Sequence, residues 1–213
     1  MDQHLHEKDR VAAIFNILRT CFPEPTTELV YETPFQLLVA VVLSAQATDK
    51  GVNKTTAPFF KTIKEAHHLA ALSINEIEEA IKSIGLYKAK ARYLKELAER
   101  LVSEHQGNIP ANREQLMQLS GVGRKTANVV LNTLYGLPFI AVDTHVYRVS
   151  HRLGFSAGPT PLAVELDLME VIPPAYLKDA HHHLILHGRY TCKARNPTCQ
   201  NCAIRSYCPS VQQ

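Results

Sequence analysis

The spacing of apolar residues along the chain predicts helices from one end to the other. The first stripe has the i, i+3, i+4, i+7 spacing of one helix face and consists of Val11, Ile14, Phe15 and Leu18. A second, very apolar helix is predicted from Pro34 to about Gln46, because Thr33 and Pro34 supply an N-cap and a first-turn proline. Alternating strand patterns are nearly absent, so we predict an all-α protein of about ten helices.

Polar residues and glycines predict where several of these helices begin and end. Ser73 and Glu76 have the spacing of a capping box, and Gly85 is expected to close the helix that they open. The helix before the cysteine-rich segment is expected to end just before Gly188. Cys21, at the end of the first helix, is expected to be a buried thiol.

The turn Ser-Gly-Val-Gly at residues 120–123 joins two predicted helices. Gly121 and Gly123 allow the left-handed conformations that a tight turn needs. The helix that starts near Arg124 presents free backbone N–H groups and the positive end of its dipole, and Lys125 adds charge, so the turn suits a phosphate. The alternative is an ordinary helix–helix turn with a solvated lysine.

Four of the five cysteines fall within residues 192–208. They are Cys192, Cys199, Cys202 and Cys208. Two disulfides fit poorly with the cytoplasm, which keeps thiols reduced. Structural zinc and an iron–sulfur cluster both use four thiolates, and the spacing by itself does not separate them.

Charge is uneven along a chain whose net charge is only +3. Residues 120–213 carry 9 Lys and Arg against 5 Asp and Glu, and residues 82–100 are also basic. Basic patches suit a nucleic-acid face, although on charge alone solvated helix faces are the simpler explanation. The charged N-terminus and the short apolar runs argue against a signal peptide and a membrane span, so we expect a cytoplasmic, DNA-associated protein.

Five segments resemble those of endonuclease III, a helix–hairpin–helix family of DNA glycosylases and AP lyases. They are residues 43–49, 84–87, 119–128, 142–145 and 187–192. The resemblance spans residues 10–208. It departs at Ser120, where the family usually has a proline that firms the entry to the hairpin, and at His183, where a bulky aromatic is common.

The resemblance implies the helix–hairpin–helix DNA glycosylase fold, built from two helical domains. A central helical bundle would span residues 25–136 and end in the hairpin. The second domain would join residues 1–24 to residues 137–213 and carry an iron–sulfur loop at residues 192–208. The resemblance further implies a monomer.

The implied reaction removes oxidised pyrimidines from duplex DNA and then cleaves the abasic site by β-elimination. Lys125 would attack C1′ of the sugar and form a Schiff base. Asp143, facing it across a cleft between the domains, would deprotonate a nucleophile or stabilise the charge on the sugar, and it also has the position of a helix N-cap. The attacking amine must be neutral, which burial under DNA, the adjacent Arg124 and the helix N-terminus would favour.

The resemblance also implies a cofactor and DNA contacts. The four cysteines would hold a [4Fe–4S] cluster with a structural role. A flipped nucleotide leaves a gap that Gln46 and Leu86 would fill, although Leu86 could instead make the hydrophobic contact that follows a glycine C-cap. Lys193 and Arg195 could be merely solvated. The residues assigned to further DNA contacts are Gly121, Gly123, Arg124, His145, Arg189, Lys193 and Arg195.

Two other functions are open at this point. Mismatch and adenine glycosylases belong to the same superfamily, although the adenine branch lacks a lysine at the position of Lys125. A non-enzymatic helix–hairpin–helix DNA-binding module with structural zinc would use the same hairpin and the same cysteines. Metal analysis and visible absorbance separate zinc from a cluster.

Overall fold

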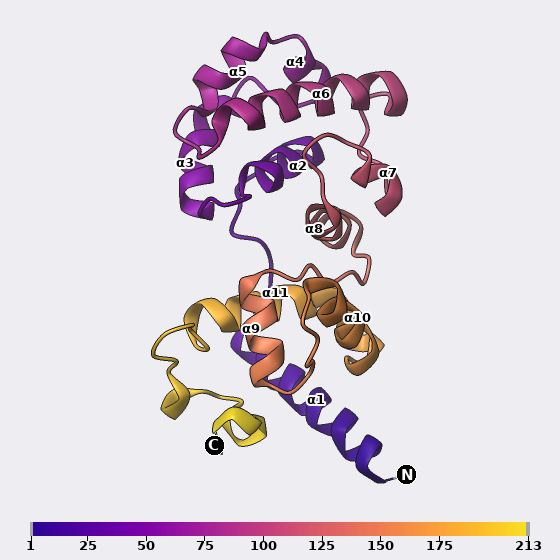
Figure 1. Ribbon diagram of the computed structural model, residues 1–213, viewed down its shortest axis with the longest axis vertical. Coiled ribbons are helices and arrows are strands. Elements are labelled where there is room, and N and C mark those ends of the chain that lie inside the picture. Colours follow the sequence, from indigo (N-terminus) through magenta and orange to yellow (C-terminus); the bar gives the residue numbers. More distant parts are fainter. Residues whose placement is uncertain (1, 212–213) are drawn as a thin grey trace. The chain divides into compact units, whose positions relative to one another are not determined.

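The computed structural model describes residues 2–211, which form an all-helical protein and confirm the predicted all-α class (Figure 1). None of the described helices is long and apolar enough to cross a membrane. The described α-helices are α1 (Asp2–Cys21), α2 (Pro34–Leu43), α3 (Asp49–Phe59), α4 (Ala66–Ala70), α5 (Ile74–Ile81), α6 (Tyr87–His105), α7 (Arg113–Met117), α8 (Arg124–Tyr135), α9 (Thr144–Arg152), α10 (Pro161–Val171) and α11 (Pro174–Tyr190). Three short 3-10 turns follow, η1 (Cys199–Asn201), η2 (Arg205–Tyr207) and η3 (Pro209–Val211).

The chain divides into two compact units. One unit spans Glu28–Tyr135 and contains helices α2 to α8. The other, which we call the second unit, joins the chain up to Thr27 to the chain from Gly136 onward. It contains α1, α9, α10, α11 and the 3-10 turns.

Helix α2 is the centre of the Glu28–Tyr135 unit. Every residue of α2 after its first proline is buried, and the helix packs against α3, α6 and α8 (Figure 1). A helix that is buried on all sides needs apolar residues on all sides, which explains the nearly continuous apolar pattern, and the buried amide of Gln36 donates to the carbonyls of Phe60 and Ile63, both at 2.9 Å. The helix ends at Leu43, earlier than predicted, and the loop after it carries Gln46 in a left-handed conformation with φ of 57°.

The other unit has its own apolar core, to which α1, α9, α10 and α11 contribute. The predicted stripe on α1 is buried in it. Gly188 lies inside α11, which continues to Tyr190, so the prediction that this helix ends before Gly188 is wrong. A Cβ on Gly188 would lie 3.0 Å from the Cβ of His145 and 3.1 Å from Cγ2 of Val149. The glycine therefore allows α9 and α11 to pack closely.

The predicted capping box at the start of α5 is confirmed. Ser73 Oγ accepts from the backbone N–H of Glu76, whose carboxylate accepts from the N–H of Ser73 at 2.8 Å. The predicted end of this helix differs, because α5 stops at Ile81 rather than at Gly85. The left-handed residue in the following turn is Leu86, with φ of 60°.

The end of α1 and a buried histidine on α11 pack together in the second unit. His183 is buried with its ring centroid 6.3 Å from that of Phe15, so it fills a place for an aromatic side chain. Burial lowers the pKa of His183, and its Nε2 lies 3.1 Å from the carbonyl oxygen of Phe22. Phe22 packs against the core while Cys21 is exposed, so the prediction of a buried Cys21 thiol is wrong.

Candidate functional site

The glycine turn between α7 and α8 is tight, as predicted, but of its two glycines only Gly121 has a left-handed conformation. The N–H of Val122 donates to the carbonyl of Leu119 at 3.1 Å. Gly121 has a φ of +76°, and a Cβ on it would lie 3.0 Å from the Cβ of Tyr93, so its backbone and its surroundings both require glycine. A Cβ on Gly123 would meet nothing within 4 Å, so no contact inside the described protein requires the second glycine.

Lys125 is the second residue of α8, and it is exposed. It lies in the first turn of the helix, where the positive end of the dipole is found and where α8 has no acidic residue. Its neighbour Arg124 is half-buried. Ser120 Oγ donates to the carboxylate of Glu96 at 2.7 Å, so a hydrogen bond to α6 ties the entry of the hairpin where a proline ring is common.

Asp143 is the N-cap of α9, as predicted. Its Oδ1 accepts from the backbone N–H groups of His145 and Val146, both at 2.8 Å. Its Oδ2 lies 3.1 Å from Nδ1 of the His145 ring. The side chain of Asp143 is 15% exposed, so one oxygen serves the helix while the other contacts a histidine at a partly open position.

Gln46 and Leu86 both have exposed side chains on loops of the Glu28–Tyr135 unit. Both have left-handed backbone conformations, which are uncommon for residues other than glycine and asparagine. Leu86 is 63% exposed, so the alternative of a hydrophobic contact after a glycine C-cap is wrong. An exposed leucine held in a strained conformation is the kind of feature that clusters at functional sites.

The four clustered cysteines line one cavity of about 260 Å³ in the second unit. None of the four forms a disulfide, and His187 Nε2 lies 3.9 Å from the sulfur of Cys202. Burial raises the pKa of the Cys202 and Cys208 thiols. Within the described residues, no group of three or more potential ligand side chains converges on a point that would suit a single metal ion.

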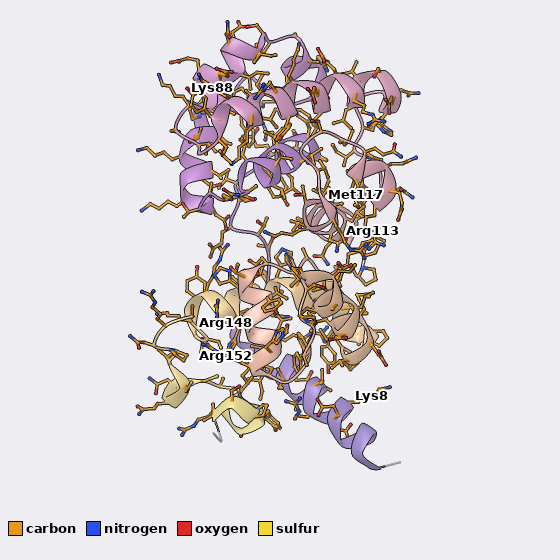
Figure 2. All side chains as sticks on the ribbon, in the orientation of Figure 1. Lys8, Lys88, Arg113, Met117, Arg148 and Arg152 are labelled. Atoms are coloured by element: carbon orange, nitrogen blue, oxygen red, sulfur yellow. The ribbon has the colours of Figure 1, made fainter. Side chains whose placement is uncertain are left out.

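Two arginines on α9 hold the start of the cysteine segment (Figure 2). Arg148 donates to the carbonyls of Cys192 at 3.1 Å and Gly188 at 2.9 Å. Arg152 donates to the sulfur of Cys192 at 3.4 Å and to the carbonyl of Lys193 at 2.7 Å. Neither arginine was predicted as a site residue from the sequence, although their i, i+4 spacing on an amphipathic helix places them on one side.

The basic residues assigned to DNA around the cysteines differ in exposure. Lys193 and Arg195 are exposed on the loop that follows α11, whereas Arg189, inside α11, is half-buried and has an interaction partner. His145, by contrast, already contacts Asp143 through its ring. Exposure leaves Lys193 and Arg195 accessible to a phosphate, as it also leaves them accessible to water.

The chain closely resembles known DNA-repair proteins. Residues 39–174 match the family described as the HhH-GPD superfamily of base excision DNA repair proteins. The chain is 49% identical over 201 residues to endonuclease III of Haemophilus influenzae, covering 94% of this chain and 95% of that one. A solved trapped endonuclease III–DNA covalent intermediate, in an estranged-adenine complex, matches with a TM-score of 0.89 and 44% identity over 96% of this chain and 97% of that chain. A non-covalent endonuclease III–DNA complex matches with a TM-score of 0.89 and 45% identity over 96% of both chains.

Proposed function

This chain belongs to the HhH-GPD superfamily of base excision DNA repair proteins and, within it, to the endonuclease III family, and from that premise we propose how it works as a DNA glycosylase and AP lyase on duplex DNA. Lys125 is the nucleophile. The observation that carries this assignment is the exposed amine in the first turn of α8, directly after the glycine turn. A solved endonuclease III relative trapped in a covalent intermediate with DNA supports a covalent mechanism.

In the proposed reaction, the neutral amine of Lys125 attacks C1′ of the damaged nucleotide. The glycosidic bond breaks, the base leaves with the bonding electrons and takes up a proton, and the nitrogen loses one. The nitrogen lone pair then displaces the ring oxygen O4′, which takes up a proton, so that the C1′–O4′ bond breaks and the opened sugar is held as a protonated Schiff base. Removal of a 2′ proton then breaks the C3′–O bond by β-elimination and cleaves the strand. Asp143 stabilises the positive charge that develops on the sugar or accepts the proton from the amine.

The glycine turn holds the DNA backbone in this proposal. Gly123 has open space where a Cβ would stand, so a phosphate can approach the positive end of the α8 dipole. Arg124 adds positive charge at the same place. Gln46 and Leu86 fill the space left by the flipped nucleotide, since both side chains are exposed on loops. His145, Arg189, Lys193 and Arg195 complete the assigned DNA contacts.

We assign a [4Fe–4S] cluster to the cavity lined by the four cysteines. A single zinc ion held at ~2.3 Å from four sulfurs would draw the thiols together and leave little space between them. Among the described residues no three ligand side chains converge on a point that would suit a single ion, while all four cysteines line one cavity. The Arg152 contact to Cys192 is typical of a group that supports a thiolate ligand. When bound, the cluster supplies structural bracing of the loop that carries Lys193 and Arg195.

Oxidised pyrimidines are the proposed substrates. The lysine at position 125 argues against the adenine branch of the superfamily, and a mismatch glycosylase is the second candidate. The cytoplasm, in association with DNA, is the location that this activity implies, and we propose that the protein acts as a monomer.

Borohydride trapping tests the nucleophile directly. The intact protein should form a covalent complex with duplex DNA that contains an oxidised pyrimidine, because borohydride reduces the Schiff base to a stable amine. Lys125→Ala should abolish the complex, whereas Lys61→Ala, which removes another exposed lysine of the same unit, should not. An unchanged yield from Lys125→Ala would reject the nucleophile.

A further inference from the structure

Lys90 is a buried lysine in the Glu28–Tyr135 unit. It lies on α6 and is only 5% exposed, whereas Lys88 on the same helix is exposed (Figure 2). An ammonium group is costly to bury unless hydrogen bonds replace its water. Lys90 has no role in the proposed reaction, so its buried contacts require another explanation.

The ammonium of Lys90 binds two backbone carbonyls at the end of α2. It donates to the carbonyl of Leu43 at 2.9 Å and to the carbonyl of Ala45 at 2.7 Å. The last carbonyls of a helix have no partner within the helix, and a positive charge is favoured at this end of the helix dipole. Burial lowers the pKa of Lys90, and the two carbonyls offset part of the cost of burying its charge.

These carbonyls lie next to Gln46. Ala45 precedes Gln46 directly, so its fixed carbonyl belongs to the peptide group that leads into Gln46. Gln46 has a φ of 57°, and residues with side chains keep such a conformation only where their surroundings impose it. The ammonium of Lys90 is one such constraint.

Lys90 also contacts the residue at the other loop tip. Its backbone N–H donates to the carbonyl of Leu86 at 3.0 Å. The turn that leads to Leu86 is held on its other side, where the hydroxyls of Ser83 and Thr55 lie 2.6 Å apart. The bond from the Lys90 N–H to Leu86 is the first backbone hydrogen bond of α6, whose N-cap is Leu86, so it does not depend on the side chain at position 90. The side chain of Lys90 thus ties the Gln46 loop to the start of the helix that carries Leu86.

We propose that Lys90 is a positioning residue whose ammonium anchors the Gln46 loop against the start of α6, and so keeps Gln46 in register with Leu86 in the conformation that fills the gap in flipped DNA. This inference rests on the proposed function of those two side chains. Lys90 acts through the carbonyls of Leu43 and Ala45 and is assigned no contact with the DNA or the reacting atoms. Loops that are ordered before DNA binds avoid the entropic cost of ordering on it. Loss of the ammonium therefore slows extrusion of a paired base more than it slows the chemistry.

Amide hydrogen exchange of the free protein tests the anchoring without DNA. Lys90→Met removes the ammonium and keeps an unbranched side chain, so exchange within residues 44–48 should rise about tenfold through local opening. The matched control is Lys95→Met, because Lys95 lies on the same helix and donates to the carbonyl of Ala70 at the end of α4. The control should leave residues 44–48 unchanged. Unchanged exchange there in Lys90→Met would overturn the anchoring.

Single-turnover excision tests the consequence for DNA. One duplex carries an oxidised pyrimidine opposite its pairing purine, and the other carries the same lesion opposite an abasic site, where no base pair has to be broken. Lys90→Met should slow the paired substrate by roughly 10- to 100-fold and the unpaired one much less. Equal slowing of both would point to a general structural defect and would contradict the positioning role. Lys90→Gln gives the same comparison if the methionine variant does not fold.

A mutant cycle tests whether Lys90 acts through the two tips. In a protein that already carries Gln46→Ala and Leu86→Ala, adding Lys90→Met should slow excision of the paired lesion little further. If Lys90→Met slows the double variant by the same factor as it slows the unaltered protein, Lys90 acts independently of the two side chains and the proposal is rejected. If the unaltered protein excises no lesion, the proposed function fails, while the exchange experiment still decides whether Lys90 anchors the loop.

Discussion

Nδ1 of His145 lies 3.1 Å from Oδ2 of Asp143, while Oδ1 of the same carboxylate caps α9. The backbone thus fixes one oxygen of the carboxylate and a histidine ring contacts the other. A ring that carries its hydrogen on Nδ1 donates it to Oδ2 and so fixes the orientation of the carboxylate. Orientation of Asp143 therefore depends on a residue two positions further along the chain.

His145→Ala should separate orientation from capping. The variant loses the ring contact but keeps the two backbone hydrogen bonds to Oδ1, so turnover should fall roughly 10- to 100-fold through misplacement of the carboxylate. The free energy of unfolding should fall by only about 1 kcal/mol, the usual value of one hydrogen bond. Single-turnover rates and urea unfolding measure the two effects. An unchanged rate would show that the ring contact does not serve the reaction.

Asp143→Asn should slow turnover far more than it weakens DNA binding. Asparagine caps helices about as well as aspartate, so α9 keeps its N-cap while the negative charge is lost. Asp143→Ala is the companion variant, because it should also lose about 1 kcal/mol of stability with the cap. Rates, DNA affinity and unfolding are compared for both variants. Equal losses of rate and affinity in Asp143→Asn would point to a purely structural cap.

The two glycines of the turn should respond differently to alanine. Gly121→Ala introduces a Cβ at a φ of +76° and 3.0 Å from Tyr93, so the free energy of unfolding should fall by about 1–3 kcal/mol. Gly123→Ala meets no neighbouring atom within 4 Å, so its stability should stay within about 0.5 kcal/mol of the unaltered protein. It should instead weaken binding to duplex DNA. Normal DNA affinity in Gly123→Ala would contradict the phosphate contact.

Arg152→Ala should destabilise the metal centre. The variant removes a donor to the sulfur of Cys192 and to the carbonyl of Lys193, and loss of such supporting groups typically lowers metal affinity about 10- to 100-fold. Visible absorbance should therefore bleach faster in the presence of an iron chelator. Arg195→Ala is the control, because Arg195 is exposed on the same loop. Equal bleaching rates in the two variants would contradict a supporting role for Arg152.

Stability should fall as the pH falls through the range in which histidines ordinarily titrate. Burial lowers the pKa of His182 to about 4, although the charge of Asp179 opposes this shift. Between about pH 6.5, the ordinary pKa of a histidine, and pH 4, the unfolded chain binds a proton that the folded chain does not. The free energy of unfolding should therefore fall by up to ~3 kcal/mol on acidification through this range. Urea unfolding at pH 7.5 and pH 5 measures the loss. His182→Phe should reduce the difference between these two values, and an unchanged difference would assign it to other groups.

Local sequence signals determined many of the helices, helix caps and turns of this protein. The stripe on α1, the capping box at Ser73 and the N-cap at Asp143 depend on residues within one or two helical turns, so their spacing along the chain is sufficient. The glycine turn and the grouping of the cysteines are also local. A short segment contains both partners of each of these interactions, which is why the sequence predicts them.

Tertiary structure decided the features whose partners lie far along the chain. Gly188 permits close packing against His145 and Val149 instead of ending a helix, and the strained residue after α5 is Leu86 rather than Gly85. Lys90 looks like any other lysine of a basic helix until Leu43 and Ala45, more than forty residues earlier, are placed against it. The free-energy cost of burying a charge depends on the atoms around it, and so does the need for a glycine at a position of close packing. Only the folded chain determines which atoms those are.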